Sequence, residues 1–138
     1  MRRIEHWIDG RSVEGASGRS GPVFDPARGV QAAEVPLASP DEVGIAVASA
    51  AQAAAAWRTT SLSARAKLLF RLRELVDRHA DELAGIVVSE HGKVLDDARG
   101  EVARGLECIE FACGIPTALQ GTRSTEVSTG VDVHTVHE

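Results

Sequence analysis

Residues 81 to 116 read DELAGIVVSEHGKVLDDARGEVARGLECIEFACGIP, and this stretch decides the fold. Apolar residues recur in it at steps of three and four, the spacing that places side chains on one face of an α-helix. The clearest series is Leu95, Ala98, Val102, Leu106, Ile109 and Cys113. Gly92 precedes that series, and glycine readily adopts the left-handed conformation that ends a helix. The stretch therefore predicts two helices separated by a stop at Gly92.

Two glycines and an arginine in the second predicted helix need a reason beyond helix formation. Gly100 and Gly105 each cost about 1 kcal/mol relative to alanine, and the simplest reason for them is the close approach of another backbone. Arg104, beside Gly105, offers a planar fork of donors that matches a carboxylate or a phosphate. The alternative is a solvated arginine in a weak surface ion pair. Its partners would be Glu101, Glu107 or Asp97.

Short strands are predicted at the start of the chain. Residues 4–13 predict a hairpin, because Asp9-Gly10 is a strong turn signal between two runs suited to strands. Residues 31–37 predict a further strand that follows a second turn. The glycines between these segments predict a loose connection, and they are Gly15, Gly18 and Gly21.

Two more helices are predicted between these strands and residue 80. Ser39 and Glu42 have the spacing of a capping box, and the helix that they begin is expected to bury the ring of Trp57 at its end. The next helix begins at Ser61 or Ser63. Its predicted buried stripe consists of Leu68, Leu69, Leu72, Leu75 and Val76.

The pattern changes to β-branched residues near the end of the chain. Val131, Val133 and Thr135 alternate with Asp132 and His134, which is the period of a half-exposed strand. A terminal strand with an open edge tends to find a partner. Residues 125–138 are therefore expected to pair with another chain.

Composition and charge exclude several classes of protein. The chain has 138 residues, the length of one ordinary domain, and a net charge of −5 without a basic stripe, which argues against a nucleic-acid partner. No run is long enough to cross a bilayer, and the N-terminus lacks the apolar stretch of a secretory signal. A cytoplasmic protein without a membrane partner is expected.

No metal site or disulfide is predicted. Cys108 and Cys113 lie five residues apart on one predicted helix, which is neither a metal-ligand spacing nor a disulfide framework. We interpret both as small apolar residues of a reduced protein. His134 and His137 lie three apart on a predicted strand, so they point to opposite faces and make a poor metal pair.

A longer motif surrounds Arg104. It comprises Ser89-Glu90-His91-Gly92-Lys93, Gly100-Glu101-Val102-Ala103-Arg104-Gly105, Glu107, Glu110-Phe111-Ala112 and Gly114-Ile115-Pro116. It is accompanied by Asp25-Pro26, Gly29, Ala33-Glu34-Val35-Pro36, Trp57 and the run at residues 127–133. With these residues the chain closely resembles the N-terminal region of aldehyde dehydrogenases, and within that superfamily it is most similar to the methylmalonate-semialdehyde dehydrogenases. The resemblance runs from about Trp7 to the last residue.

The resemblance implies the N-terminal portion of an α/β aldehyde dehydrogenase fold. That portion would be mainly helical, with short β-hairpins and a terminal oligomerisation strand. Residues 1–122 would be the first part of the NAD-binding, Rossmann-like domain. Residues 123–138 would start the oligomerisation hairpin, so a homo-oligomer is expected through residues 125–138.

The resemblance also implies the chemistry of the complete enzyme. In the family a cysteine attacks the aldehyde, NAD takes a hydride and, in the acylating subfamily, coenzyme A takes the acyl group. The catalytic cysteine, the glutamate, the oxyanion asparagine and the cofactor pocket all follow the last residue of this chain in the family. No catalytic and no cofactor-binding residue is therefore assigned here. Arg104 matches the arginine that is associated with the substrate carboxylate, so it is predicted to bind substrate.

Two functions remain open at this point. The first is an N-terminal fragment of an NAD-dependent, CoA-acylating methylmalonate-semialdehyde dehydrogenase, which would oxidise malonate or methylmalonate semialdehyde to acyl-CoA when complete and would be inactive as this chain alone. The alternative is a stand-alone interaction module that docks on dehydrogenase subunits or on itself.

Overall fold

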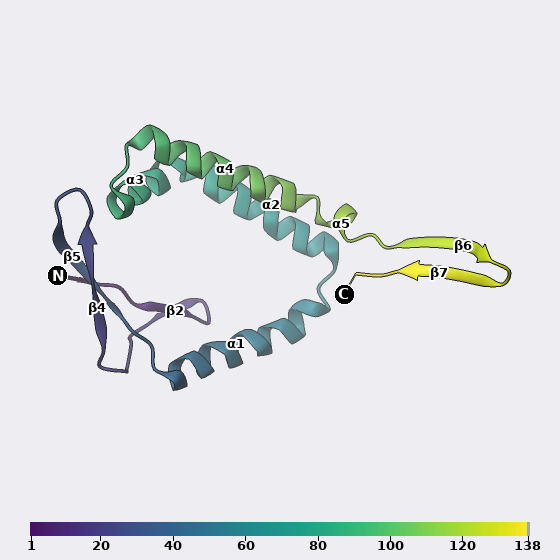
Figure 1. Ribbon diagram of the computed structural model, residues 1–138, viewed down its shortest axis with the longest axis horizontal. Coiled ribbons are helices and arrows are strands. Elements are labelled where there is room, and N and C mark those ends of the chain that lie inside the picture. Colours follow the sequence, from purple (N-terminus) through teal and green to yellow (C-terminus); the bar gives the residue numbers. More distant parts are fainter. Residues whose placement is uncertain (138) are drawn as a thin grey trace. The chain divides into compact units, whose positions relative to one another are not determined.

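The computed structural model describes residues 1–137, and the chain forms two compact units. The first comprises Met1–Thr60 with Asp81–Arg99, and the second comprises Ser61–Ala80 with the residues from Gly100 onward. The strands are β1 (Arg2–Arg3), β2 (His6–Ile8), β3 (Arg11–Val13), β4 (Ser20–Asp25), β5 (Val30–Pro36), β6 (Thr122–Ser128) and β7 (Val131–Thr135), and all but β1 and β3 are labelled in Figure 1. The helices are α1 (Pro40–Arg58), α2 (Leu62–Arg78), α3 (Ala80–His91), α4 (Leu95–Cys113) and α5 (Ile115–Ala118). The predicted fold class, α/β with a mainly helical segment and short hairpins, is confirmed.

Two small sheets form the start of the first unit. The predicted hairpin is confirmed as β2 and β3, and Asp9 and Gly10 in its turn both adopt positive φ, 55° and 70°. The other sheet has β5 at its centre, with β4 antiparallel on one side and β1 parallel on the other. The prediction of a loose connection is wrong at Gly21, because Gly21 pairs with Val35 inside this sheet. The sequence did not predict β1.

The start of α1 agrees with the prediction from the sequence, but the predicted burial near its end does not. The Glu42 backbone N–H donates to Ser39 Oγ at 3.2 Å, and the Ser39 backbone N–H donates to Glu42 Oε2 at 2.7 Å, so the predicted capping box is confirmed. The predicted burial of Trp57 is wrong, since this residue is 46% exposed. The reason is that the described chain covers α1 only in part, and none of its residues is buried.

Glu42 also holds the loop before β4 against the first turn of α1. The Ala16 backbone N–H donates to Glu42 Oε1 at 2.6 Å across 26 residues of chain. This donor first, and then the Ser39 N–H, lowers the pKa of Glu42 from 4.5 to about 2. The loop also lies against the end of β5, because a Cβ added at Gly15 would overlap the side chain of Pro36. The carboxylate therefore fastens the loop to the helix.

Glu42→Gln is expected to destabilise the chain at neutral pH and to have less effect in acid. The N–H donors stabilise the ionised carboxylate, so its contribution is complete above the ordinary pKa of 4.5 and is lost as the pH falls toward about 2. Urea unfolding of the parent chain and of Glu42→Gln, at several pH values between neutral and acid, checks the expectation. Glu74→Gln, at an exposed glutamate outside the contact, is the control. A difference for Glu42→Gln that stays constant in acid would contradict this role.

The stop at Gly92 is confirmed. Gly92 follows α3 with a φ of 71°, and a Cβ there would lie 3.0 Å from Cγ of Pro26, so both conformation and space favour glycine. In the last turn of α3, Glu90 accepts a hydrogen bond from Arg2 Nη2 at 2.8 Å. This ion pair fastens the end of α3 to β1 within the first unit.

The second unit joins α2 to the later part of α4 through one arginine. Arg73 Nε donates to Glu110 Oε1 at 2.9 Å, and Arg73 Nη1 donates to Asp77 Oδ2 at 2.9 Å. Ser61 is the N-cap of α2. This agrees with the first of the two predicted starts, Ser61 and Ser63. The predicted burial of the leucine stripe is wrong, because the described chain covers that face only in part. The exposed members are Leu68 at 52%, Leu72 at 43% and Leu75 at 49%.

The strands β6 and β7 form a hairpin whose residues are all exposed (Figure 1, yellow end of the chain). The register shifts between Ser124 and Ser128, and Glu126 in the irregular part adopts a φ of 49°. Asp132 of β7 spans this irregularity. It accepts hydrogen bonds from Arg123 Nη2 at 2.9 Å and from the Glu126 backbone N–H at 3.1 Å. The Arg123 guanidinium first, and then that N–H, holds the pKa of Asp132 below its usual value.

Gly121 lies directly before β6, at the end of the same hairpin that is opposite its turn. A Cβ added at Gly121 would overlap the carbonyl oxygen of Thr135, the last residue of β7. The two chain segments therefore approach each other more closely than any residue with a side chain allows.

The interior of the described residues is built from small side chains. The buried apolar residues are Ala33, Ala66, Ala84, Ala98 and Cys113. None of the larger apolar side chains in residues 1–137 is fully buried, and many are about half exposed. Amphipathic helices are therefore present, but their apolar faces are only partly covered.

Candidate functional site

The candidate site lies on the exposed face of α4. Successive residues of a helix are rotated by about 100°, so Gly100, Arg104, Cys108 and Phe111 share one face. The opposite face carries the predicted apolar series. On that face Ala98 and Cys113 are buried, and Val102, Leu106 and Ile109 are half-buried. Packing on one side of α4 thus presents Arg104 on the other.

Arg104 has no ion pair and no hydrogen bond from its side chain within residues 1–137. The alternative of a surface pair with a neighbouring acidic residue is therefore not realised in this structure. Its Nη1 lies over Gly100, 3.7 Å from the position that a Cβ of Gly100 would occupy. An unpaired guanidinium at the surface can accept a carboxylate in a bidentate hydrogen bond.

The two helix glycines beside Arg104 do not meet another backbone in the described part of the chain. A Cβ at Gly105 would have no atom within 4 Å, and one at Gly100 would meet only the Arg104 side chain. The described residues therefore do not supply the predicted close approach. Instead, a Cβ at Gly105, next to Arg104, would point into open space within the described residues.

Phe111 lies two turns from Arg104 on the same face and is 85% exposed. An exposed aromatic ring costs free energy in water, because its apolar area remains hydrated. The face therefore combines a cation with an apolar surface.

The two cysteines differ in their surroundings. Cys113 is buried on the apolar face as predicted, and Cys108 is exposed one turn from Arg104. Within residues 1–137 no cluster of three or more His, Cys, Asp or Glu side chains could hold a metal ion. No helix in that range has both the length and the apolar character needed to cross a membrane.

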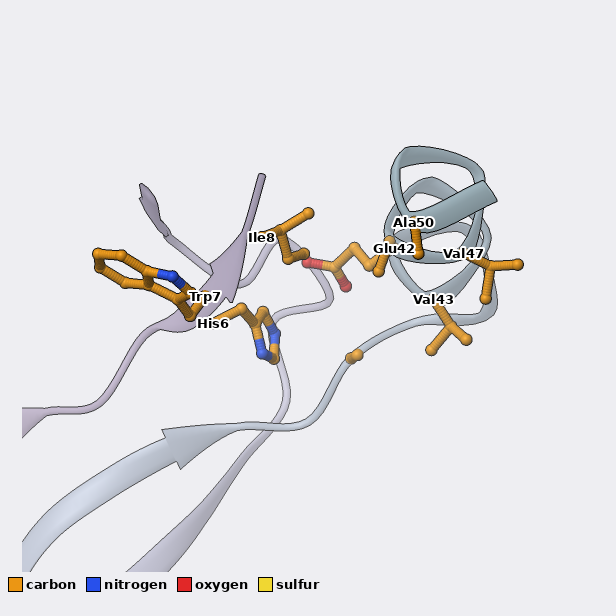
Figure 2. Close-up of a pocket in the computed structure, with 9 residues that line it drawn as sticks. His6, Trp7, Ile8, Glu42, Val43, Val47 and Ala50 are labelled. Atoms are coloured by element: carbon orange, nitrogen blue, oxygen red, sulfur yellow. The ribbon is translucent and has the colours of Figure 1, made fainter. Parts of the chain in front are cut away.

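A separate hollow of about 400 Å³ lies in the first unit between β2 and α1 (Figure 2). Most of its lining is apolar, and Figure 2 shows Ile8 and Glu42 turned toward each other while the ring of Trp7 points away from the helix. Glu42 is already engaged by two backbone N–H groups, and His6 Nε2 lacks a hydrogen-bond partner among the described residues. No predicted site residue lies in this hollow.

Sequence reasoning missed several polar contacts that shape the units. They are Arg2 with Glu90, Ala16 with Glu42, Arg73 with Glu110 and Arg123 with Asp132. Three of these join residues far apart in the chain, and a single sequence carries no signal for such pairs. Arg123 and Asp132 carry opposite charges within the hairpin that the resemblance implies for residues 123–138, and that signal could have paired them.

One family model matches most of the chain. It is described as the aldehyde dehydrogenase family, and it covers residues 12–138.

Curated relatives and solved structures agree with that match. Malonate-semialdehyde dehydrogenase 2 of Geobacillus thermodenitrificans is 42% identical over 131 residues, which are 95% of this chain and 27% of the relative. A methylmalonate-semialdehyde dehydrogenase structure from Sinorhizobium meliloti, complexed with NAD, superposes with a TM-score of 0.92 at 37% identity and covers 99% of this chain and 28% of that one. The corresponding structure from Oceanimonas doudoroffii has a TM-score of 0.89 at 42% identity, with 96% and 27% covered. The chain thus spans just over a quarter of the length of these proteins.

Proposed function

Because this chain belongs to the aldehyde dehydrogenase family, we propose that it forms the N-terminal part of an NAD-dependent, CoA-acylating malonate- or methylmalonate-semialdehyde dehydrogenase. The complete enzyme would oxidise the semialdehyde to an acyl-CoA. The similarity to proteins named for these substrates supports the substrate class. NAD in the Sinorhizobium meliloti structure supports the nicotinamide cofactor.

The observation that carries the proposal is the unpaired Arg104 on the exposed face of α4. Malonate semialdehyde has a carboxylate and an aldehyde in one small molecule. The guanidinium would bind the carboxylate through two hydrogen bonds and thereby fix the direction in which the aldehyde points. The apolar surface of Phe111 on the same face would lie near the hydrocarbon part.

The cofactors would be held by other parts of the complete enzyme. Residues 1–137 include no glycine-rich loop that could hold the phosphates of a dinucleotide. The unpaired guanidinium of Arg104 is suited to a carboxylate instead. When bound, NAD accepts the hydride and coenzyme A accepts the acyl group. The 138 residues alone would therefore bind part of the substrate without converting it.

The proposal also assigns the two parts of the chain. Residues 1–122 would belong to the NAD-binding domain, and residues 123–138 would start the oligomerisation hairpin. The complete exposure of β6 and β7 supports a partner on this hairpin. We propose that the partner is another subunit of the same enzyme.

The test combines protein size with activity. An antiserum raised against the 138 residues should detect a protein several times larger in the source cells. That protein should form NADH from malonate semialdehyde only when coenzyme A is present, and the isolated 138-residue chain should form none. Sustained NADH formation by the short chain, or a full-length protein indifferent to coenzyme A, would contradict the proposal.

The exposed hairpin also supports a second candidate function, a stand-alone module that docks on dehydrogenase subunits or on itself. This candidate predicts a cellular protein of 138 residues that elutes together with a full-length dehydrogenase. The same antiserum distinguishes the two functions by the size of the band.

A further inference from the structure

We propose that Gly100 is a positioning residue for Arg104. Because Gly100 has no side chain, no acceptor lies one helical turn before Arg104, and the guanidinium stays available for the carboxylate of the substrate. The inference rests on the proposed function, in which Arg104 binds that carboxylate. It follows from the geometry of α4 and from the way in which other arginines of the helices are engaged.

Gly100 and Arg104 lie one turn apart on the same face of α4. Helical side chains lean toward the N-terminus of their helix, so the Arg104 side chain runs back over position 100. Its Nη1 lies 3.7 Å from the position that a Cβ of Gly100 would occupy. This contact is formed within one helix, so it does not depend on which other parts of the complete enzyme surround α4.

Other arginines of the helices show what an acidic side chain at such a position does. Arg73 donates to Asp77, four residues later, at 2.9 Å, and Arg99 is engaged by an acidic residue three positions before it. A glutamate four positions before a basic residue is a favourable partner in a helix. Gly100 occupies that position relative to Arg104, which has no ion pair within residues 1–137.

The glycine also gives up local stability. Glycine is the least favourable residue inside a helix after proline. A glutamate at position 100 would stabilise α4 in two ways, by its higher helix propensity and by an ion pair with Arg104. Stability that is given up in this way is typical of functional sites. The function that we assign to Gly100 is to leave Arg104 without a partner in its own helix.

Gly100→Glu in the complete enzyme tests this role. The added carboxylate would accept hydrogen bonds from Arg104, so the ratio of kcat/KM for malonate semialdehyde to kcat/KM for propanal should fall by about 10-fold. Gly100→Lys adds a side chain of similar length without an acceptor, so its ratio should stay well above that of Gly100→Glu. Ala103→Glu is the matched control, because it places the same charge at an exposed position on another face of α4. It should lower the ratio by less than about threefold.

A double-mutant cycle shows whether the effect of Gly100→Glu passes through Arg104. In an Arg104→Gln background, Gly100→Glu should change the ratio further by less than about threefold, because the guanidinium that it would engage is gone. A further loss of about 10-fold in that background would mean that the added charge repels the substrate directly. An equal loss in Gly100→Glu and Gly100→Lys would mean that bulk at position 100 is responsible. Either result would overturn the proposed role.

Urea unfolding of the 138-residue chain gives a second readout that does not depend on activity. Gly100→Glu should raise the urea midpoint while it impairs the carboxylated substrate, a combination that a merely structural position would not show. A lower midpoint would contradict the inference. So would an unchanged activity ratio in Gly100→Glu beside a lowered ratio in Arg104→Gln, and that result would leave the proposed function intact. A parent enzyme without CoA-dependent NADH formation would instead overturn the proposed function, and this inference with it.

Discussion

Arg104→Gln is expected to lower kcat/KM of the complete enzyme for malonate semialdehyde by about 10- to 100-fold. The variant keeps a polar side chain, but that side chain is shorter by two bonds and carries no charge. A hydrogen bond to a charged group contributes about 1.5–3 kcal/mol, and each 1.4 kcal/mol corresponds to a factor of ten. Propanal has no carboxylate, so its kcat/KM should change by less than about threefold. Steady-state NADH formation with both aldehydes measures the difference.

Arg99→Gln is the matched control for this experiment. Arg99 lies on the same helix, but its guanidinium is engaged by Asp81 at 2.8 Å and by Asp96 at 3.4 Å. Its loss should leave the ratio of activities toward the two aldehydes unchanged. Arg104→Lys adds a second comparison, because it keeps the charge and loses the planar fork, so it should fall between Gln and the parent. An equal loss for both aldehydes in Arg104→Gln would indicate a structural role and would contradict carboxylate binding.

Gly121→Ala is expected to open the base of the β6–β7 hairpin. The added Cβ would overlap the Thr135 carbonyl oxygen, and neither backbone segment can move away without breaking the pairing of Thr122 with Thr135. Amide hydrogen exchange of residues 122–135 should become at least about 10-fold faster, which corresponds to roughly 1.4 kcal/mol of lost local stability.

Gly105→Ala adds the same methyl group as Gly121→Ala, but it is expected to stabilise the chain. Gly105 lies inside α4, and a Cβ there would have no atom within 4 Å. Alanine is favoured over glycine in a helix by about 1 kcal/mol, so urea unfolding should show a gain of up to that size. A loss of stability at Gly105 would mean that another element approaches α4 closely. Unchanged exchange in Gly121→Ala would mean that the hairpin base is looser than the structure indicates.

Local features of the fold could be predicted because all their atoms lie within a few residues. The capping box of Ser39 and Glu42 and the stop at Gly92 are of this kind. The contact of Glu42 with Ala16 could not be predicted, since it depends on how a distant loop folds back. Helical period identifies which residues share a face, but not what covers that face. For this reason the leucine stripe of α2 and the ring of Trp57 are more exposed than the sequence suggests.

The candidate site rests partly on sequence patterns and partly on contacts that only the structure shows. The spacing within α4 assigns Arg104 to the face opposite the apolar series, and family resemblance suggests its substrate role. Only the structure shows that Arg104 is unpaired within the described residues and that the space around Gly105 is open. Phe111 was not singled out from the sequence, although its seven-residue spacing from Arg104 is a signal that could have placed it on the same face.

The interior of small side chains has a consequence for how such a protein is made. In the complete enzyme that we propose, the ribosome would synthesise these residues first, at about 5–20 residues per second. Until the following domains emerge, the uncovered leucines and valines of the helices and the ring of Trp57 would remain exposed to water. Such a nascent chain would be a substrate for chaperones that bind extended apolar segments, and its yield would depend on how quickly translation proceeds beyond it.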